Sequence, residues 1–316
     1  MAKIDHCPQG RRWRDALPST ALRALSWFSI AVAAASATAA AAPTEGAQVA
    51  APSNASAAPP ASAAWVRQLR AGRILVAGGT GRNGSAIVAA LEAHGAKPRI
   101  LARDLAKARE RFPGDHDWVE GDVTRAETLA AAVKGIDIII DAVATSEVDG
   151  PNGFEAVDLG GMKNLIAAAK PAGVKRIVLI TGATVGRDPK TWPPFLQRGM
   201  AIKRETEKAL IGSGIDYVVL RPTGITPRPG NAWAIGIYAQ SEFRWPEVEQ
   251  GFPARPQLPP ADAPPPPATI ARPDLAEVAI VAAVAPQAAR RVFVVSHDQG
   301  RASAAWARRL GRMPRE

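Results

Sequence analysis

A glycine-rich turn between an apolar run and a helical pattern constrains the fold of this chain more than any other feature. The residues from Arg73 to Ala77 are apolar enough for a buried strand, and apolar residues recur at helical spacing from Ser85 to His94. Between them lies Gly78-Gly-Thr-Gly-Arg-Asn-Gly84. The first glycine permits a tight turn, the middle one lets the backbone approach a pyrophosphate, and the last lets helix and strand pack closely. The motif predicts a dinucleotide site formed by Gly78, Thr80, Gly81, Arg82, Asn83 and Gly84, with the helix N-terminus facing the phosphates.

The alternation of strand and helix patterns continues after this turn. Further strands are expected at 98–102, 117–120, 136–143, 175–181, 216–220 and 291–295, and helices at 105–112, 125–133, 153–172, 196–213 and 273–284. Apolar strands separated by helices indicate a parallel sheet covered on both faces. We expect an α/β fold, a doubly wound Rossmann-like parallel sheet over 71–300 with a small C-terminal substrate-pocket region.

The end of the second strand bears on the choice of cofactor. NAD sites usually place a carboxylate there for the ribose 2′-hydroxyl, whereas this strand ends in Leu101-Ala-Arg-Asp104. Arg103 is placed to meet a 2′-phosphate, and Arg82 is able to close over the same group. NADP(H) is therefore favoured over NAD(H). Asp104 keeps NAD open, and the alternative is that Arg103 and Asp104 begin a solvated helix.

Two more residues are expected at the cofactor. Asp122 follows the third strand and is placed to bind the adenine amino group; equally, it is placed to cap the segment that begins at Thr124. Val143 ends the fourth strand and is expected to line the cofactor site.

The first 70 residues form a separate unit. Residues 1–42 combine a basic start with an Ala-rich apolar run, which is typical of a signal peptide or an N-terminal anchor, and 43–70 form a Pro/Ala/Ser linker. An organelle transit peptide is an alternative. The net charge of +10 resides mainly in the two ends, because 73–284 holds 25 basic and 24 acidic residues. We expect association with the cell envelope through the N-terminus, with a cytoplasmic protein as the alternative.

Several segments together resemble a known superfamily. They are Ile74–Gly84, Leu101–Asp104, Glu120–Asp122, Glu207–Pro222 and Asp274–Ala279. These segments are similar to the atypical short-chain dehydrogenase/reductase superfamily, in its NAD(P)H-binding NmrA-like branch. Asp188–Gln197 also looks like a loop of the flavin reductase/biliverdin reductase B group. The resemblance implies a Rossmann-like fold, a nicotinamide cofactor and a small-molecule substrate bound by the C-terminal third.

The usual proton donor of short-chain dehydrogenases is missing. Those enzymes use a Tyr-x-x-x-Lys pair, but Tyr217 and Tyr238 are followed four residues later by Arg221 and Glu242. Lys203 stands near the place of the family lysine, with Gly199 four residues before it. Lys203 is a candidate to hold the nicotinamide ribose or else a solvated helical lysine. Thr181 or Thr184 is placed to bond a substrate carbonyl or else to cap the loop.

The region 227–268 departs from a compact fold. It carries five aromatic residues and then a proline tract: Trp233, Tyr238, Phe243, Trp245, Phe252 and Pro256–Pro267. The aromatics are expected to line or cover a substrate pocket, or to pin a loop to the surface. Residues 301–316 form a basic tail.

Other classes of function lack support. The single cysteine and four scattered histidines show no metal-binding spacing, and no basic face interleaves with aromatics for nucleic acid. Two functions remain. One is an NADPH-dependent reductase acting on a planar acceptor such as a flavin, quinone or enone; the other is a non-catalytic NAD(P)(H)-binding redox sensor or scaffold. The sequence leaves the oligomeric state open.

Overall fold

The structure is a computed structural model that describes residues 63–192, 194–245, 268–303 and 305–312. The expected signal or anchor at 1–42, most of the linker, Phe252 and the tract Pro256–Pro267 lie outside the described residues. Among the helices that are described, none combines the length and the apolar character needed to cross a bilayer.

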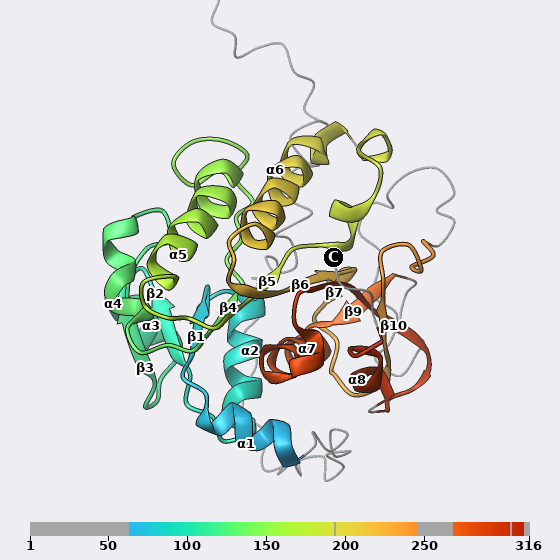
Figure 1. The fold of residues 1–316 in the computed structure, drawn as a ribbon, viewed down its shortest axis with the longest axis horizontal. Helices are drawn as coiled ribbons and strands as arrows, with labels where there is room; N and C mark the ends of the chain where they lie inside the picture. The colour runs from blue at the N-terminus through green and yellow to red at the C-terminus, as the bar shows by residue number, and fades with distance from the viewer. Residues whose placement is uncertain (1–62, 193, 246–267, 304, 313–316) are drawn as a thin grey trace, which may run out of the picture.

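An eight-stranded sheet forms the centre of the fold (Figure 1). Its order is β3-β2-β1-β4-β5-β6-β10-β8. The strands are β1 (Ile74–Ala77), β2 (Arg99–Ala102), β3 (Asp117–Glu120), β4 (Ile138–Asp141), β5 (Arg176–Ile180), β6 (Asp216–Pro222), β8 (Trp233–Tyr238) and β10 (Arg291–Arg301). All neighbours run parallel except β8, which is antiparallel to β10. The order reverses between β1 and β4, where doubly wound sheets bind their ligands. The predicted fold class is confirmed.

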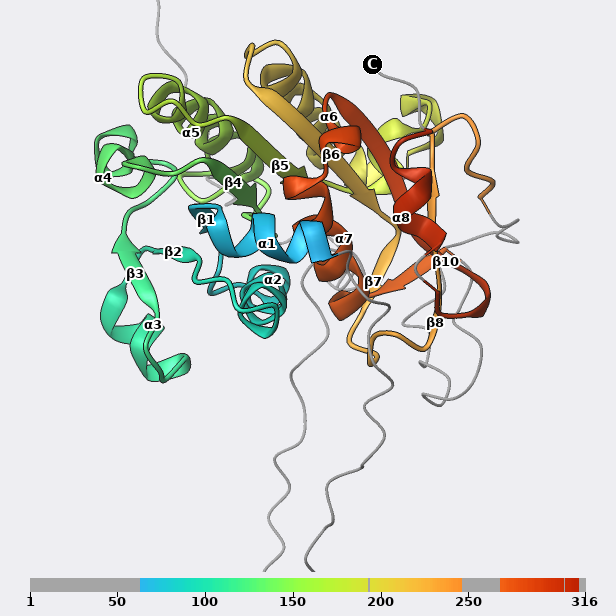
Figure 2. The same ribbon diagram turned by 60° about the horizontal axis from the view of Figure 1, so that its bottom comes forward.

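Helices cover both faces of this sheet (Figures 1 and 2). One face carries α1 (Ala63–Ala71), α2 (Arg82–Ala93) and α7 (Arg272–Val284); the other carries α4 (Leu129–Val133), α5 (Gly161–Ala169) and α6 (Pro194–Ile211). The helix α3 (Leu105–Arg111) follows β2. Alternate strand residues supply the two apolar cores, with Val76 and Ile140 on the α2/α7 side and Leu75 and Ile139 on the other. Burial on both faces explains why these strands are almost wholly apolar.

Part of the predicted insertion extends the sheet. β8 lies within 227–268 and adds an edge strand beside β10. The short strands β7 (Gly224–Thr226) and β9 (Thr269–Ala271) pair in parallel as a separate sheet. The segment expected to be only a loop or pocket cover therefore contains the strand β8 and is flanked by β7 and β9.

Two boundaries differ from the expectation. The linker predicted to reach residue 70 is helical from Ala63, because Leu69 is fully buried in the core with α2 and α7 and Arg70 Nε donates to His94 O at 2.8 Å. The predicted basic tail also contains α8 (Ala305–Arg309), whose Trp306 is buried in the same core. Apolar burial, rather than local composition, explains why α1 and α8 are helical.

One helix begins irregularly. A π-helical segment, Glu155–Gly160, leads into α5 and carries the buried Asp158. Short 3₁₀ turns occur at Ala126–Thr128, Ala183–Gly186, Pro189–Thr191 and Pro286–Ala288.

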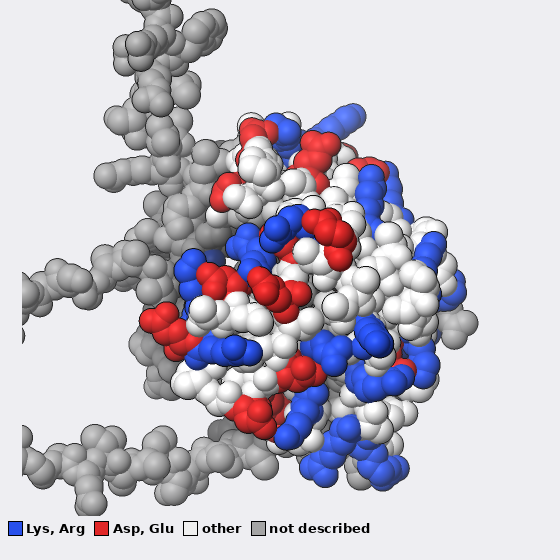
Figure 3. Space-filling view, turned by 90° about the vertical axis from the view of Figure 1, so that its left-hand side faces the viewer, with Lys and Arg blue, Asp and Glu red and all other residues white. Residues whose placement is uncertain are grey.

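Charges of both signs are interspersed on the face shown in Figure 3. Ion pairs at the β2–β3 side of the molecule include Arg99–Asp117 at 3.1 Å and Lys107–Asp104 at 3.0 Å. Mixed surface pairs of this kind contribute little individually to the free energy of unfolding.

Candidate functional site

The glycine loop after β1 closes tightly on the loop after β4. Gly78 has φ +74°, and a Cβ there would lie 2.8 Å from the backbone nitrogen of Val143. A Cβ at Gly84 would overlap the carbonyl oxygen of Gly78 and lie 2.6 Å from its carbonyl carbon. Gly81 N–H donates to Gly78 O at 2.8 Å, which completes the turn. Only glycine fits at the two outer positions, and the loop forms the backbone cradle that a dinucleotide pyrophosphate requires.

The start of α2 leaves its backbone donors uncovered. Its N-cap residue is Gly81, which provides no side-chain cap, so the first N–H groups of the helix face the loop unsatisfied by a side chain. Thr80 is half-buried beside them, and Arg82 is exposed. Asn83 is partly buried and accepts a hydrogen bond at 3.1 Å from Nε of Arg272, at the start of α7. An uncapped helix start is an anion site, and a dinucleotide phosphate fits it.

The end of β2 presents one cation and one helix cap. Arg103 is exposed. Asp104 is the N-cap of α3, where Oδ1 accepts from Lys107 N at 3.0 Å, and this backbone hydrogen bond holds the pKa of the carboxyl below its usual value. Asp104 therefore does begin the helix, as the alternative had it, while Arg103 is left facing solvent.

Asp122 bonds within its own turn. Its Oδ1 accepts from Thr124 N at 2.9 Å and from Thr124 Oγ1 at 2.8 Å. The short helix that follows, Ala126–Thr128, has Arg125 as its N-cap, so Asp122 orders the turn before the helix but does not cap it. The predicted contact between Asp122 and adenine stays a prediction.

A buried ionisable cluster lies close to the cofactor loop, at the carboxyl end of β4. Asp141 ends this strand and accepts from Val143 N at 3.0 Å, so it orders the segment that Gly78 touches. The pKa of Asp141 is raised to about 7, mainly by burial and in part by the charge of Asp158, while the hydrogen bond from Val143 and the charge of Lys203 oppose the rise. Asp141 is thus a carboxyl group able to gain or lose a proton near neutral pH.

Lys203 forms the cationic part of this cluster. Its Nζ makes an ion pair with Asp158, and each side chain is only 5% exposed, so Lys203 is not a solvated helical lysine. The Nζ atom also lies 5.8 Å from the ring centroid of Phe154. Oδ2 of Asp158 is buried and lacks a hydrogen-bond partner among the described residues. The predicted contact of Lys203 with a nicotinamide ribose stays a prediction.

The ring of Phe154 occupies the space beside Gly199. A Cβ at Gly199 would lie 3.0 Å from Cε2 of Phe154 and 3.2 Å from Cζ. Gly199 stands four residues before Lys203, where a dehydrogenase of the usual type carries its tyrosine. The packing at this point is built without that side chain.

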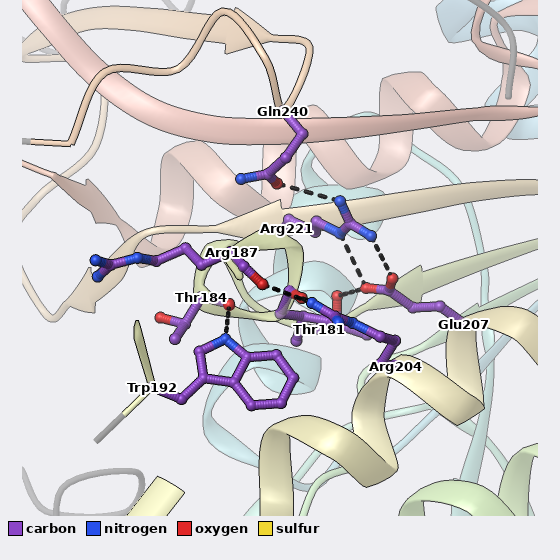
Figure 4. A network of polar contacts seen from close by, with 9 residues as sticks. Thr181, Thr184, Arg187, Trp192, Arg204, Glu207, Arg221 and Gln240 are labelled. Atoms are coloured by element: carbon purple, nitrogen blue, oxygen red, sulfur yellow. Dashed lines mark hydrogen bonds and ion pairs between the residues drawn. The ribbon is translucent and has the colours of Figure 1, made fainter. Parts of the chain in front are cut away.

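Thr181 belongs to a second buried network, seen in Figure 4. Its Oγ1 donates to Glu207 Oε1 at 2.6 Å. Glu207 also accepts from Nε and Nη2 of Arg221 at 3.1 and 2.6 Å, and Arg221 Nη1 donates to Gln240 at 3.1 Å. A carboxylate only accepts hydrogen bonds, so the Thr181 hydroxyl is the donor in this contact. Its one proton is therefore in use, and only its two lone pairs are left to accept a hydrogen bond from a ligand. Donation by Thr181 to a substrate carbonyl requires that this bond open.

The loop after β5 is held by α6 (Figure 4). Arg204 donates to the backbone oxygens of Val185 and Arg187 at 2.5 and 2.6 Å, and its guanidinium lies 4.6 Å from the ring of Trp192. Trp192 Nε1 donates to the backbone oxygen of Thr184 at 2.8 Å. Thr184, the alternative to Thr181, thus sits in a loop fixed by backbone contacts.

Three aromatics of 227–245, namely Tyr238, Phe243 and Trp245, form a series of ring contacts. Tyr238 and Phe243 lie edge to face at 5.4 Å, as do Phe243 and Trp245 at 5.2 Å. Arg187 lies 4.9 Å from the ring of Trp245. This series joins β8 to the loop after β5, which agrees with the alternative of aromatics that anchor a loop.

The structure therefore brings together the glycine loop, Val143 and the cluster of Asp141, Asp158 and Lys203. Arg103, Asp122 and Thr181 stand at the ends of three other strands. Sequence reasoning did not single out four of the residues found here: Asp141, Asp158, Glu207 and Arg272. Only Asp141 had a local signal, an acid closing the apolar run Ile138-Ile-Ile-Asp141.

Within the part of the chain that the structure describes, no group of three His, Cys, Asp or Glu side chains is arranged for a metal ion.

Comparison with known proteins gives matches at this site. Residues 78–249 match the NAD(P)H-binding protein family. The chain is 34% identical over 165 residues to the photosystem II assembly factor Ycf39 of Synechocystis sp.. This match covers 52% of this chain and 48% of that protein. It is 33% identical over 173 residues to the NAD(P)H azoreductase of Xenophilus azovorans, covering 55% of each. It is 28% identical over 220 residues to the sanguinarine reductase of Eschscholzia californica, covering 58% of this chain and 79% of that enzyme.

The fold also matches solved structures. The oxidoreductase ylbE from Lactococcus lactis superposes with a TM-score of 0.56 at 20% identity, covering 77% of this chain and 99% of that one. This likeness concerns the fold alone. The chain spans about half the length of the assembly factor and of the azoreductase.

Proposed function

This chain belongs to the NAD(P)H-binding family, and we propose that it is an NADPH-dependent reductase that passes a hydride to a planar acceptor such as a flavin, a quinone or an enone. One observation carries the proposal: the glycine loop folds so tightly that a Cβ at Gly78 or Gly84 would strike backbone atoms, and this loop leads into an uncapped helix start. Bound NADPH would supply the hydride, while the residues of the chain bind and orient both molecules.

The reductase assignment is supported by two features. Among the relatives are proteins named NAD(P)H azoreductase and sanguinarine reductase. The usual tyrosine is missing, and Phe154 packs beside Gly199 instead. A flavin-like acceptor needs orientation over the nicotinamide more than a protein proton donor, so it fits a site of this kind.

The preference for NADPH rests on Arg82 and Arg103. Both side chains are exposed, at the glycine loop and at the end of β2. Two charge-assisted contacts to a 2′-phosphate, each worth about 1–2 kcal/mol, would give a preference on the order of 10²-fold over NADH.

The test is titration of the full chain with NADPH and with NADH by nicotinamide fluorescence, followed by turnover with a flavin and a quinone. We expect tighter binding of NADPH and oxidation of NADPH by at least one acceptor. Arg103→Ala should remove most of the preference and leave the affinity for NADH unchanged, while Arg109→Ala, an exposed change on α3, should alter neither. Equal affinity of the unaltered chain for both cofactors would refute the arginine assignment.

A second candidate is a non-catalytic redox sensor or scaffold. Its support is that the polar side chains near the strand ends pair with one another, as Lys203 does with Asp158 and Arg221 with Glu207. Tight NADPH binding without turnover on any planar acceptor would favour this function.

A further inference from the structure

The start of α7 lies beside the start of α2. The strand β9 leads directly into α7, whose first residue is Arg272 and whose N-cap, Ala271, offers no side-chain cap. Two contacts set the helices in the same direction: Arg272 meets Asn83 near the start of α2, and Glu277 meets His94 at its end, at 3.1 Å. Two uncapped helix starts therefore share the edge of the sheet that carries the glycine loop.

Arg82, at the start of α2, and Arg272, at the start of α7, both lie at this edge. Arg272 is partly buried; burial lowers its pKa, and the nearby charge of Arg82 lowers it further. Among the described residues, no carboxylate forms an ion pair with either side chain. A guanidinium does not lose its proton in proteins, so the two positive charges remain close together. An anion bound at Arg272 would offset the repulsion between the two charges.

The geometry of Arg272 leaves its outer nitrogens free for that anion. Asn83 accepts from Nε, which fixes the plane of the guanidinium. Nη1 and Nη2 form no hydrogen bond with the described residues, and these two groups are the pair that binds phosphate oxygens side by side.

We propose that Arg272, held beside the glycine loop by Asn83, binds the pyrophosphate of the nicotinamide dinucleotide. The proposal rests on the proposed function and adds a residue 189 positions away from Asn83 in the sequence. The C-terminal part of the chain would then contribute directly to cofactor affinity.

The position of α7 selects the pyrophosphate over the 2′-phosphate. α7 packs on β4, β5 and β6, on one side of β1 in the sheet. Arg103 follows β2, on the other side of β1. The pyrophosphate lies at the helix start between these two sides, whereas the 2′-phosphate lies toward the end of the second strand. Arg272 is therefore expected to act equally on NADPH and NADH, and Arg103 on NADPH alone.

The experiment compares Arg272→Gln, Arg272→Lys and the control Arg109→Ala in the full chain. Dissociation constants for NADPH, NADH and reduced nicotinamide riboside, which carries no phosphate, are measured by fluorescence. Arg272→Gln should weaken both dinucleotides by a common factor of about 10 or more, with the riboside unaffected. Arg272→Lys keeps the charge and should lose only part of this affinity, and it serves as the test if the Gln variant does not fold. Arg109→Ala should change nothing.

Each other outcome overturns the proposal. Unchanged dinucleotide affinity in both Arg272 variants would refute it while leaving the proposed function intact, because the unaltered chain still binds. A loss confined to NADPH would place Arg272 at the 2′-phosphate, and a loss seen only in the KM of the acceptor would place it at the substrate. If the unaltered chain binds neither dinucleotide, the proposed function fails, and this inference fails with it.

Discussion

The glycine loop and the strand ends beside α6 hold their polar groups in opposite ways. At the loop, the start of α2 is uncapped and Arg82 is exposed. Beside α6, Lys203 is paired with Asp158, and Glu207 binds both Thr181 and Arg221, all inside the protein. The first region offers donors to a ligand as it stands; the second has its donors engaged.

This difference separates binding from chemistry. Backbone N–H groups at a helix start donate hydrogen bonds to an anion without rearrangement, because the helix fixes their direction. A side chain in a buried ion pair contacts a substrate only if that pair opens or the substrate uses its remaining lone pairs. We therefore expect cofactor binding to tolerate changes in the α6 networks, and stability to depend strongly on them.

The largest effect is expected from Gly84→Val. The added side chain would overlap the carbonyl of Gly78 and push the start of α2 away from the loop. Loss of two or more phosphate contacts at about 1.5–3 kcal/mol each would weaken NADPH binding by more than about 10²-fold, as measured by fluorescence titration. Gly224→Ala is the control, since a Cβ there has neighbours only at 3.4 Å and beyond. Retained affinity in Gly84→Val would show that the loop does not hold the cofactor.

The next effect concerns the other region, through Glu207→Gln. This change leaves the buried Arg221 without a counter-charge, which costs about 3–5 kcal/mol of the free energy of unfolding. Urea unfolding measures it. The matched control is Glu205→Gln on the same helix, whose exposed pair with Lys208 is worth less than about 1 kcal/mol. If the two variants unfold alike, the Glu207–Arg221 pair does not stabilise the fold.

A smaller, pH-dependent effect is expected from Asp141→Asn. The folded-state pKa of about 7 lies above the unfolded value, so the folded state binds the proton more tightly and its stability falls as pH rises from about 4 to 7. Asparagine keeps an acceptor for Val143 N and does not ionise. Between pH 5 and pH 8, the variant should gain about 2–3 kcal/mol relative to the unaltered chain, as followed by urea unfolding at both values. A difference that does not change with pH would mean that Asp141 titrates normally.

The part of the fold that could be predicted from the sequence is the part defined by short sequence patterns, namely the glycine loop and the strands and helices around it. β1, the glycine loop and α2 follow one another within twenty residues, and each pattern limits the next. The strands after them are buried on both faces, so their apolar runs stand out against the helices between them. The glycine loop and the strands and helices around it were therefore accessible from the residues alone.

Contacts between distant segments were not accessible. β8 pairs with β10 some sixty residues later without a hairpin turn to announce it, as in the partners Tyr238 and Val294. The sequence marks Glu207 only as the first residue of a segment that resembles the family. Its contacts with Arg221 on β6 and with Thr181 after β5 could not be predicted from that segment. Arg272 meets Asn83 only because α7 returns to α2. The spacing of residues along the chain does not predict contacts between segments that are distant in the sequence.

The π-helical turn before α5 makes the buried Lys203–Asp158 pair a matter of register. A π turn holds one residue more than an α turn, and each helical residue rotates the next by about 100°. Deleting Leu159, which lies between Asp158 and α5, would restore a regular α-helix there, and Asp158 would be turned by up to about this angle relative to α5. The carboxylate of Asp158 would no longer face Lys203. Removing a single codon from this segment would thus break the buried ion pair between Lys203 and Asp158, although both residues would still be present in the chain.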